Sequence, residues 1–158
     1  MSEVRIKPAL LRASERTVSG LEYLRRLVAG EIGNVPIGDT LGFSLVEAED
    51  GRVALVGNPD ERSFNLMGSV HGGWPAAILD TAMALSTLSS LDAHHGFTTV
   101  DIKINYLRPI TRETGEVRAE GRLLHGGRRI ALCEGRLVDR AGKLLCHGTS
   151  TCLIISKS

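Results

Sequence analysis

The sequence has few aromatic residues, no paired cysteine motif and no long run of apolar residues. Aromatic residues make up 4% of the 158 residues and hydrophobic residues 42%, so a buried core has to be mainly aliphatic. No apolar run of signal-peptide length follows the N-terminus, and no stretch is expected to span a membrane. We therefore expect a cytoplasmic protein with no membrane partner.

Neither the charge nor the cysteines indicate a specialised partner. The formal net charge of +1 argues against nucleic acid and against strongly acidic partners. Cys133, Cys146 and Cys152 form no CxxC motif and no metal-ligand spacing, so we expect reduced core residues. His94 and His95 lack a third ligand and are expected to lie in a solvated loop. The sequence thus predicts no metal site and no redox cofactor.

The length of the chain suits one domain, without internal repeats or low-complexity segments. We divide it into an N-terminal part, residues 1–35, and a main domain, residues 36–158. Within the first part, residues 1–14 are expected to form a mobile arm, and Ser14 or Thr17 to cap the helix that follows. No glycine-rich loop of the kind that binds nucleotide phosphates is present.

The main domain contains one long helical pattern and several alternating apolar segments separated by turn residues. One helix accompanied by consecutive strands favours an α+β fold. The expected strands are residues 41–47, 52–57, 98–107, 116–124, 128–138 and 143–155.

Residues 65–88 are the segment around which the chain is organised. A polar, glycine-rich loop leads into a long apolar helix whose one carboxylate is Asp80, and no other residue from Trp74 to Leu91 ionises. An aspartate is rarely buried unless something pairs with it or uses it. Asp80 is therefore a candidate catalytic residue. The alternative is a structural carboxylate bonded to backbone amides.

The start of this helix is suited to binding an anion. Gly72 and Gly73 allow a turn, and Pro75 fits the first helical turn, so we expect the helix to begin near the two glycines. The first N–H groups of a helix have no partners within it and carry partial positive charge. Because Gly72 has no side chain, its N–H is open to a carbonyl oxygen that becomes anionic during acyl transfer.

Gly72 and Asp80 are too far apart to act on one carbon within a single chain. Eight residues of helix span roughly 12 Å. If both groups act on one substrate, two copies of the helix have to run antiparallel, with each site taking one group from each chain. Small residues on the Asp80 side leave room for a neighbouring helix or a narrow substrate, and they are Gly73, Ala76, Ala77 and Ala84.

The loop and helix resemble the signature of hotdog-fold acyl-CoA thioesterases of the PaaI-like, phenylacetate-degradation type. The similarity covers roughly residues 36–155. It implies a helix wrapped by an antiparallel sheet and dimers joined edge to edge, often paired into tetramers, with active sites shared between subunits. The residues that carry it are Asn65, Gly68, His71-Gly72-Gly73 and Asp80, with residues 59–62 before them and 98–109 after them.

Thioester hydrolysis requires an activated water or nucleophile and a stabilised oxyanion. We assign Asp80 as the general base or nucleophile, and the Gly72 N–H as the group that polarises the carbonyl. Asn65 is expected to orient water or the thioester, and His71 to shape the loop or assist the leaving thiolate. By the resemblance, Thr99 places a hydroxyl near the attacking water.

The expected substrate is an acyl-CoA, in which coenzyme A is part of the substrate rather than a cofactor. Its phosphates call for basic side chains, and Arg108, Arg128 and Arg129 are the candidates. Gly73 is expected to line the substrate site. The acyl group is left open, because Phe64, Met67 and Trp74 suit either an acyl pocket or the core.

Two other functions are compatible with this fold. A hotdog dehydratase or hydratase pairs a histidine with a glutamate on the helix, and that pair is not found here. A non-catalytic acyl-CoA sensor would keep the fold and lose the acid, so Asp80 argues against it.

Overall fold

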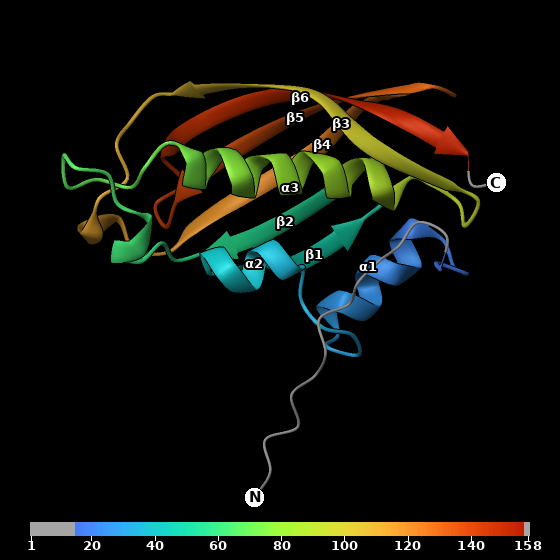
Figure 1. Cartoon of the computed structure of the whole chain (residues 1–158), viewed down its shortest axis with the longest axis horizontal. Coiled ribbons are helices and arrows are strands. Elements are labelled where there is room, and N and C mark those ends of the chain that lie inside the picture. The colour runs from blue at the N-terminus through green and yellow to red at the C-terminus, as the bar shows by residue number, and fades with distance from the viewer. Residues whose placement is uncertain (1–14, 157–158) are drawn as a thin grey trace, which may run out of the picture.

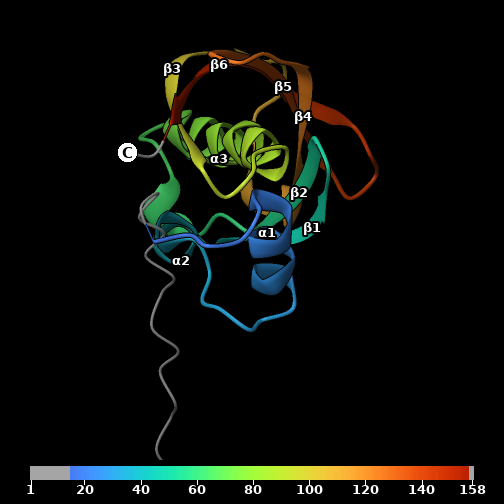
Figure 2. The same cartoon turned by 90° about the vertical axis from the view of Figure 1, so that its right-hand side faces the viewer.

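The computed structural model describes residues 15–156, in which a curved antiparallel sheet wraps around one long helix (Figures 1 and 2). The arm expected at residues 1–14 lies outside the described residues. The helices are α1 (Gly20–Val28), α2 (Pro36–Leu41) and α3 (Gly73–Ser89). The strands are β1 (Phe43–Glu49), β2 (Arg52–Gly57), β3 (His95–Tyr106), β4 (Val117–Gly126), β5 (Ile130–Asp139) and β6 (Leu144–Ser156).

Within residues 15–156 the strands form one sheet in the order β1-β2-β4-β5-β6-β3, with every neighbouring pair antiparallel. β3 is the one strand out of sequence order, because it follows α3 and pairs with β6 at the far edge. Figure 2 shows the strands curving around α3. The predicted α+β fold, with a central helix and an extra N-terminal helix, is confirmed.

The buried face of α3 fixes how the helix is rotated on the sheet. Ile78, Leu79 and Met83 are fully buried, and each such side chain stabilises the fold by about 1.5–3 kcal/mol. The backbones also approach closely: a Cβ at Gly121 of β4 would lie 2.0 Å from the carbonyl oxygen of Ala82. No side chain tolerates that distance, so glycine is required there. This packing directs the opposite side of α3 away from β4.

Trp74, at the start of α3, belongs to the core rather than to an acyl pocket. The residue is 3% exposed, and its ring meets the ring of Phe43 edge-on, with 6.2 Å between the centroids. Its indole N–H donates to the carbonyl of Leu41 at 2.7 Å. Phe64 packs against the same core, whereas Met67 is exposed at the tip of a loop.

The N-terminal region differs from prediction at both of its helices. Ser19, rather than Ser14 or Thr17, caps α1, because its hydroxyl accepts from the N–H of Glu22 at 3.2 Å. The strand expected from residue 41 begins instead at Phe43, since Pro36–Leu41 forms the short helix α2. Proline in its first turn and a left-handed glycine after its last residue are ordinary signals for such a helix.

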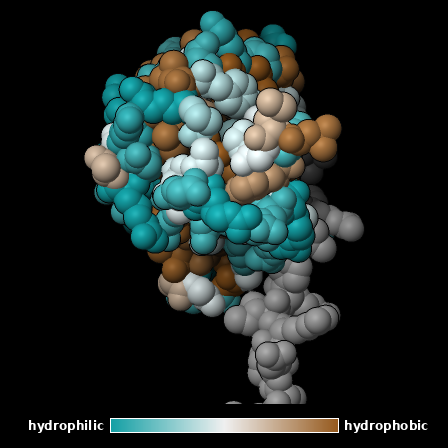
Figure 3. All heavy atoms as spheres, turned by 90° about the vertical axis from the view of Figure 1, so that its left-hand side faces the viewer, coloured by the Kyte–Doolittle hydropathy of each residue, from teal (hydrophilic) through white to brown (hydrophobic). Residues whose placement is uncertain are grey.

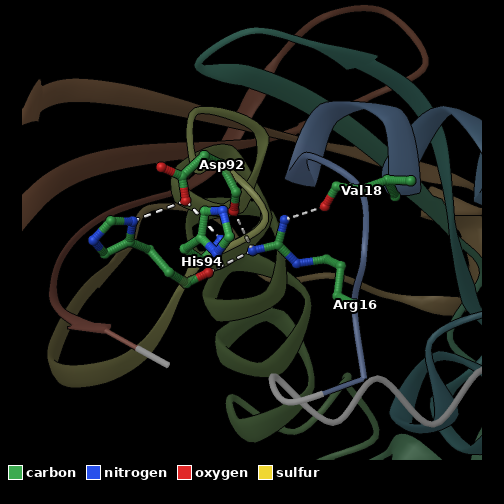
Figure 4. A network of polar contacts seen from close by, with 5 residues as sticks. Arg16, Val18, Asp92 and His94 are labelled. Carbon is green, nitrogen blue, oxygen red and sulfur yellow. Dashed lines mark hydrogen bonds and ion pairs between the residues drawn. The ribbon is translucent and has the colours of Figure 1, made fainter. Parts of the chain in front are cut away.

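Arg16, which precedes α1, holds the turn between α3 and β3 (Figure 4). Its guanidinium donates to the carbonyls of Val18 at 2.8 Å and Asp92 at 2.7 Å, and also to that of His95. The Asp92 carboxylate accepts from the N–H of His94 and bonds to the ring of His95. These contacts assign the two histidines to the structure of the turn, and β3 begins three residues earlier than predicted.

The cysteines lie in the core without disulfides, as predicted: Cys133, Cys146 and Cys152. Across residues 15–156, no helix is both long and apolar enough to cross a membrane. In the same range, no three His, Cys, Asp or Glu side chains come together as a metal site would require.

Candidate active site

Asp80 lies near the middle of α3 and is half-buried. Thr99 Oγ1, from β3, donates to Asp80 Oδ1 at 3.1 Å. Burial raises the pKa of Asp80 above its ordinary value, and the bond from Thr99 partly offsets that rise. A raised pKa makes the carboxylate a stronger base. Oδ2 has no hydrogen-bond partner among residues 15–156, so this oxygen is open to water.

The first turn of α3 leaves one backbone N–H without a partner. The Gly73 N–H donates to His71 Nδ1, and the Trp74 N–H to the His71 carbonyl, both at 2.9 Å. The next residue is proline, and the Ala76 N–H bonds to the Gly72 carbonyl at 3.2 Å. Within the described chain, the Gly72 N–H has no acceptor. The helix therefore offers one free donor at its positive end.

His71 and Asn65 both act on the loop before α3. Because His71 Nδ1 accepts from Gly73, that nitrogen carries no proton, and the ring shapes the start of the helix. The Asn65 carbonyl oxygen accepts from the N–H groups of Met67 at 2.8 Å and Ser69 at 3.3 Å. One amide proton of Asn65 goes to Ser69 Oγ, which leaves the other for a ligand.

Tyr106, at the end of β3, contacts the oxyanion candidate and was given no role from the sequence. Its hydroxyl donates to the Gly72 carbonyl at 2.7 Å, and a Cβ at Gly72 would lie 3.3 Å from its ring. Burial raises the pKa of Tyr106, which keeps the hydroxyl proton in place. Alternation along β3, which places Ile102, Ile104 and Tyr106 on one face, is the signal that indicates its direction.

A cleft of about 300 Å³ lies beside Gly72 and Tyr106. This volume is at the lower end of the range for small-molecule sites. Figure 3 views the molecule from the end where α3 begins, and hydrophobic side chains show there among hydrophilic ones. The other residues lining the cleft are mostly apolar: Val70, Pro75, Leu107, Arg108, Pro109, Ile110 and Cys146.

The three candidate arginines lie at two different places. Arg108 borders the cleft beside Gly72 and donates to the carbonyl of Leu144 at 2.6 Å. Arg128 and Arg129 border a second cleft, of about 740 Å³, that also includes Ser90 after the last turn of α3. The structure therefore places one arginine near the start of the helix and two near its end.

A single chain does not assemble the whole predicted site. Asp80 and Thr99 meet in the middle of α3, whereas Gly72, Gly73 and His71 gather at its start. The helix between them spans roughly 12 Å.

The two edges of the sheet differ in how well they are covered. β1 is seven residues long, carries a bulge between Leu45 and Glu47, and has α1 and α2 beside it (Figure 1). β3 is twelve residues long, and its exposed apolar side chains include Val100, Ile102 and Tyr106. A long, apolar, unpaired edge is typical of a strand that pairs with another chain.

Comparison with known proteins identifies the class. Residues 67–146, half of the chain, match the model of the Thioesterase superfamily. This segment includes α3, β3, β4 and β5, and the first residues of β6. The chain belongs to the thioesterase superfamily, and it is accordingly an enzyme that hydrolyses thioesters, as predicted.

Individual relatives agree with this assignment. Human acyl-coenzyme A thioesterase 13 is 30% identical over 113 residues, which cover 69% of this chain and 77% of that protein. The 1,4-dihydroxy-2-naphthoyl-CoA hydrolase of Listeria monocytogenes is 25% identical over 119 residues, 75% of this chain and 95% of that one. The crystal structure of a phenylacetic acid degradation-related protein from Ralstonia eutropha has a TM-score of 0.75 at 27% identity, covering 83% and 98%. The predicted PaaI-like resemblance is confirmed.

Proposed function

We propose that the protein hydrolyses acyl-CoA or aryl-acyl-CoA thioesters, with Asp80 as general base and the Gly72 N–H as oxyanion donor. The observation that carries this proposal is the free Gly72 N–H beside an apolar cleft. Relatives named for coenzyme A thioester hydrolysis support the substrate class.

In the proposed reaction, Asp80 takes a proton from water while the water oxygen bonds to the thioester carbonyl carbon. The carbonyl oxygen becomes anionic and accepts from the Gly72 N–H. When the carbonyl re-forms, the carbon–sulfur bond breaks and the thiolate takes the proton from Asp80. The products are a carboxylic acid and free coenzyme A. Thr99 on Oδ1 leaves Oδ2 to receive the proton of water.

We further propose that two chains share each site. Pairing of the β3 edges would lay two α3 helices side by side and antiparallel. The Asp80 side of α3 carries small, partly exposed residues that leave room for the second helix: Gly73, Ala76, Ala77 and Ala84. The start of one helix then approaches the middle of the other, and Gly72 from one chain faces Asp80 from its partner. A tetramer would be two such dimers.

The same arrangement gives the arginines a role. Arg128 and Arg129 lie near the end of α3. With Gly72 opposite Asp80, the last turns of each antiparallel helix extend past the start of its partner. These two residues, together with Arg108 at the start, are the groups we propose for the coenzyme A phosphates. We propose no metal and no redox cofactor, and a cytoplasmic location suited to three free thiols.

The test is release of free thiol from a panel of aromatic, short-chain and medium-chain acyl-CoAs, run with and without a chelator, beside equilibrium binding of the same compounds. Turnover that the chelator leaves unchanged is expected. Binding without turnover would identify a sensor instead and overturn the proposal.

A further inference from the structure

Two hydrogen bonds from different parts of the chain hold the carbonyl of Gly72. The Tyr106 hydroxyl, from the end of β3, donates to this oxygen at 2.7 Å, and the Ala76 N–H donates to it at 3.2 Å. The bond from Ala76 belongs to the first turn of α3, whereas the bond from Tyr106 ties that turn to the sheet. The Gly73 N–H, on the same peptide group, donates to His71 Nδ1 at 2.9 Å. The peptide group between the two glycines is therefore bonded on both sides.

The preceding peptide group carries the proposed oxyanion donor. Its carbonyl, from His71, accepts from the Trp74 N–H at 2.9 Å. In a trans peptide the N–H points opposite to the carbonyl, so the Gly72 N–H points away from Trp74. Within residues 15–156 this N–H has no acceptor. Its direction relative to the helix depends on the backbone angles of Gly72, which join the two peptide groups.

Glycine is the residue least able to hold those angles by itself. Because it has no Cβ, it reaches more backbone conformations than any other residue. The missing Cβ that lets a thioester approach the Gly72 N–H also leaves the backbone there free to rotate. Bonds from outside the residue have to supply the restraint.

Tyr106 is well placed to supply part of this restraint, because its own backbone is anchored. β3 pairs with β6 as far as this residue, and the next two N–H groups, of Leu107 and Arg108, both donate to the Leu145 carbonyl at 2.9 and 3.1 Å. The ring also packs against the glycine, since a Cβ at Gly72 would lie 3.3 Å from it. The hydroxyl thus connects the start of α3 to a fixed point on the sheet.

We propose that Tyr106 is a positioning residue: its O–H, bonded to the Gly72 carbonyl, holds the Gly72 backbone in the conformation that leaves the N–H free. The single O–H is committed to that carbonyl, so it donates no proton to the substrate. The oxyanion forms fully only along the reaction path, so the contribution of Tyr106 is to kcat rather than to substrate binding. This inference rests on the proposed role of the Gly72 N–H as oxyanion donor.

The first test removes the hydroxyl and keeps the ring. Tyr106 is 54% exposed, so Tyr106→Phe is expected to fold. We expect it to lower kcat roughly threefold to tenfold, the worth of one neutral hydrogen bond, with little change in KM. The acid limb of its pH profile is expected to match the parent, because the pKa of Asp80 depends on burial and on Thr99. A parental kcat, or an effect confined to KM, would overturn the proposal.

Tyr23→Phe is the matched control. Tyr23 is the other tyrosine of the chain, and it lies on α1, partly buried against the core and outside the cleft beside Gly72. Its variant loses the same hydroxyl and is expected to keep the parental kcat. Equal losses in the two variants would show a general effect on the fold and would overturn the proposal. Replacing Tyr106 with para-aminophenylalanine keeps a donor at the same place and is expected to recover most of the lost kcat.

A measurement that does not depend on activity separates this proposal from the proposed function. The protein is prepared with isotope-labelled glycine, and the amide signal of Gly72 is assigned by its absence from Gly72→Ala. The NMR order parameter of this N–H, about 0.85 for a rigid backbone, is expected to fall in Tyr106→Phe but not in Tyr23→Phe. An unchanged value in Tyr106→Phe would refute the positioning role. Parental turnover in Gly72→Val would refute the proposed oxyanion donor while leaving this measurement decisive.

Discussion

The start of α3 and the middle of the same helix present opposite electrostatic features. At the start, the Gly72 N–H lies at the positive end of the helix dipole and has no acceptor in the described chain. In the middle, Asp80 places a negative charge where burial makes ionisation unfavourable. The Gly72 N–H is suited to bind a negatively charged oxygen, and the Asp80 carboxylate is suited to accept a proton.

The separation of these two features along one rigid helix has a consequence for assembly. The proposed reaction requires both at one carbonyl, and a helix cannot bring its own start to its own middle. In the proposed mechanism, the two features therefore form one site between two chains. Each prediction below removes or relocates one of them.

The largest effect is expected from removing the base. Asp80→Asn keeps the shape of the side chain and the bond from Thr99, but its amide cannot take a proton from water. We expect kcat/KM to fall about 10²–10⁴-fold, the usual contribution of a general base. Thermal unfolding is the control, because a folded variant with near-parental turnover would show that Asp80 is not the base.

Blocking the donor is expected to have the next largest effect. Gly72 has φ −55° and ψ −23°, which any residue adopts, so substitution strains no backbone there. A side chain at Gly72 would point at the Tyr106 ring and fill the cleft. We expect Gly72→Val to lower kcat/KM about 10²–10³-fold, as loss of one oxyanion donor does elsewhere, and Gly72→Ala to lower it less. If Gly72→Val folds, assembles and turns over at the parental rate, the oxyanion contact lies elsewhere.

Mixing the two inactive chains tests the sharing of sites directly. Each dimer of one Asp80→Asn chain and one Gly72→Val chain has one site with both parental groups. Random assembly makes half of the dimers mixed, so roughly a quarter of parental activity is expected to return. If each chain held its own complete site, the mixture would show only the average of its two inactive components.

The sequence was sufficient to predict features that depend on neighbours along the chain. The start of α3 at two glycines and a proline, its apolar length and the lone Asp80 are all local patterns, and the structure has them where expected. The helix α2 departs from the prediction although its proline and glycine signals are local, because the apolar pattern from Leu41 predicts a strand there.

Other features depend on which strands become neighbours. The bond from Tyr106 to Gly72 joins residues 34 positions apart, and the bond from Thr99 to Asp80 joins residues 19 positions apart. Neither contact follows from periodicity. The meeting of Gly72 and Asp80 across two chains remains a proposal, which the sequence alone suggests from their separation along one helix.

The smallest effect is expected from Thr99→Val, which leaves both features in place and alters only the pKa of the base. Burial raises the pKa of Asp80 and the Thr99 hydroxyl lowers it, so removing the hydroxyl raises it further. Catalysis requires the ionised form, so the acid limb of kcat/KM is expected to move to higher pH, with turnover close to the parent on the alkaline side. The linked effect on stability has a defined sign. A group whose pKa is higher in the folded state stabilises the fold below its unfolded pKa, and this contribution is lost as pH rises through the folded value. Thr99→Val is expected to extend the pH range of this stabilising contribution upward, whereas Asp80→Asn removes the contribution. An unchanged acid limb in Thr99→Val would mean that a different group titrates in the profile.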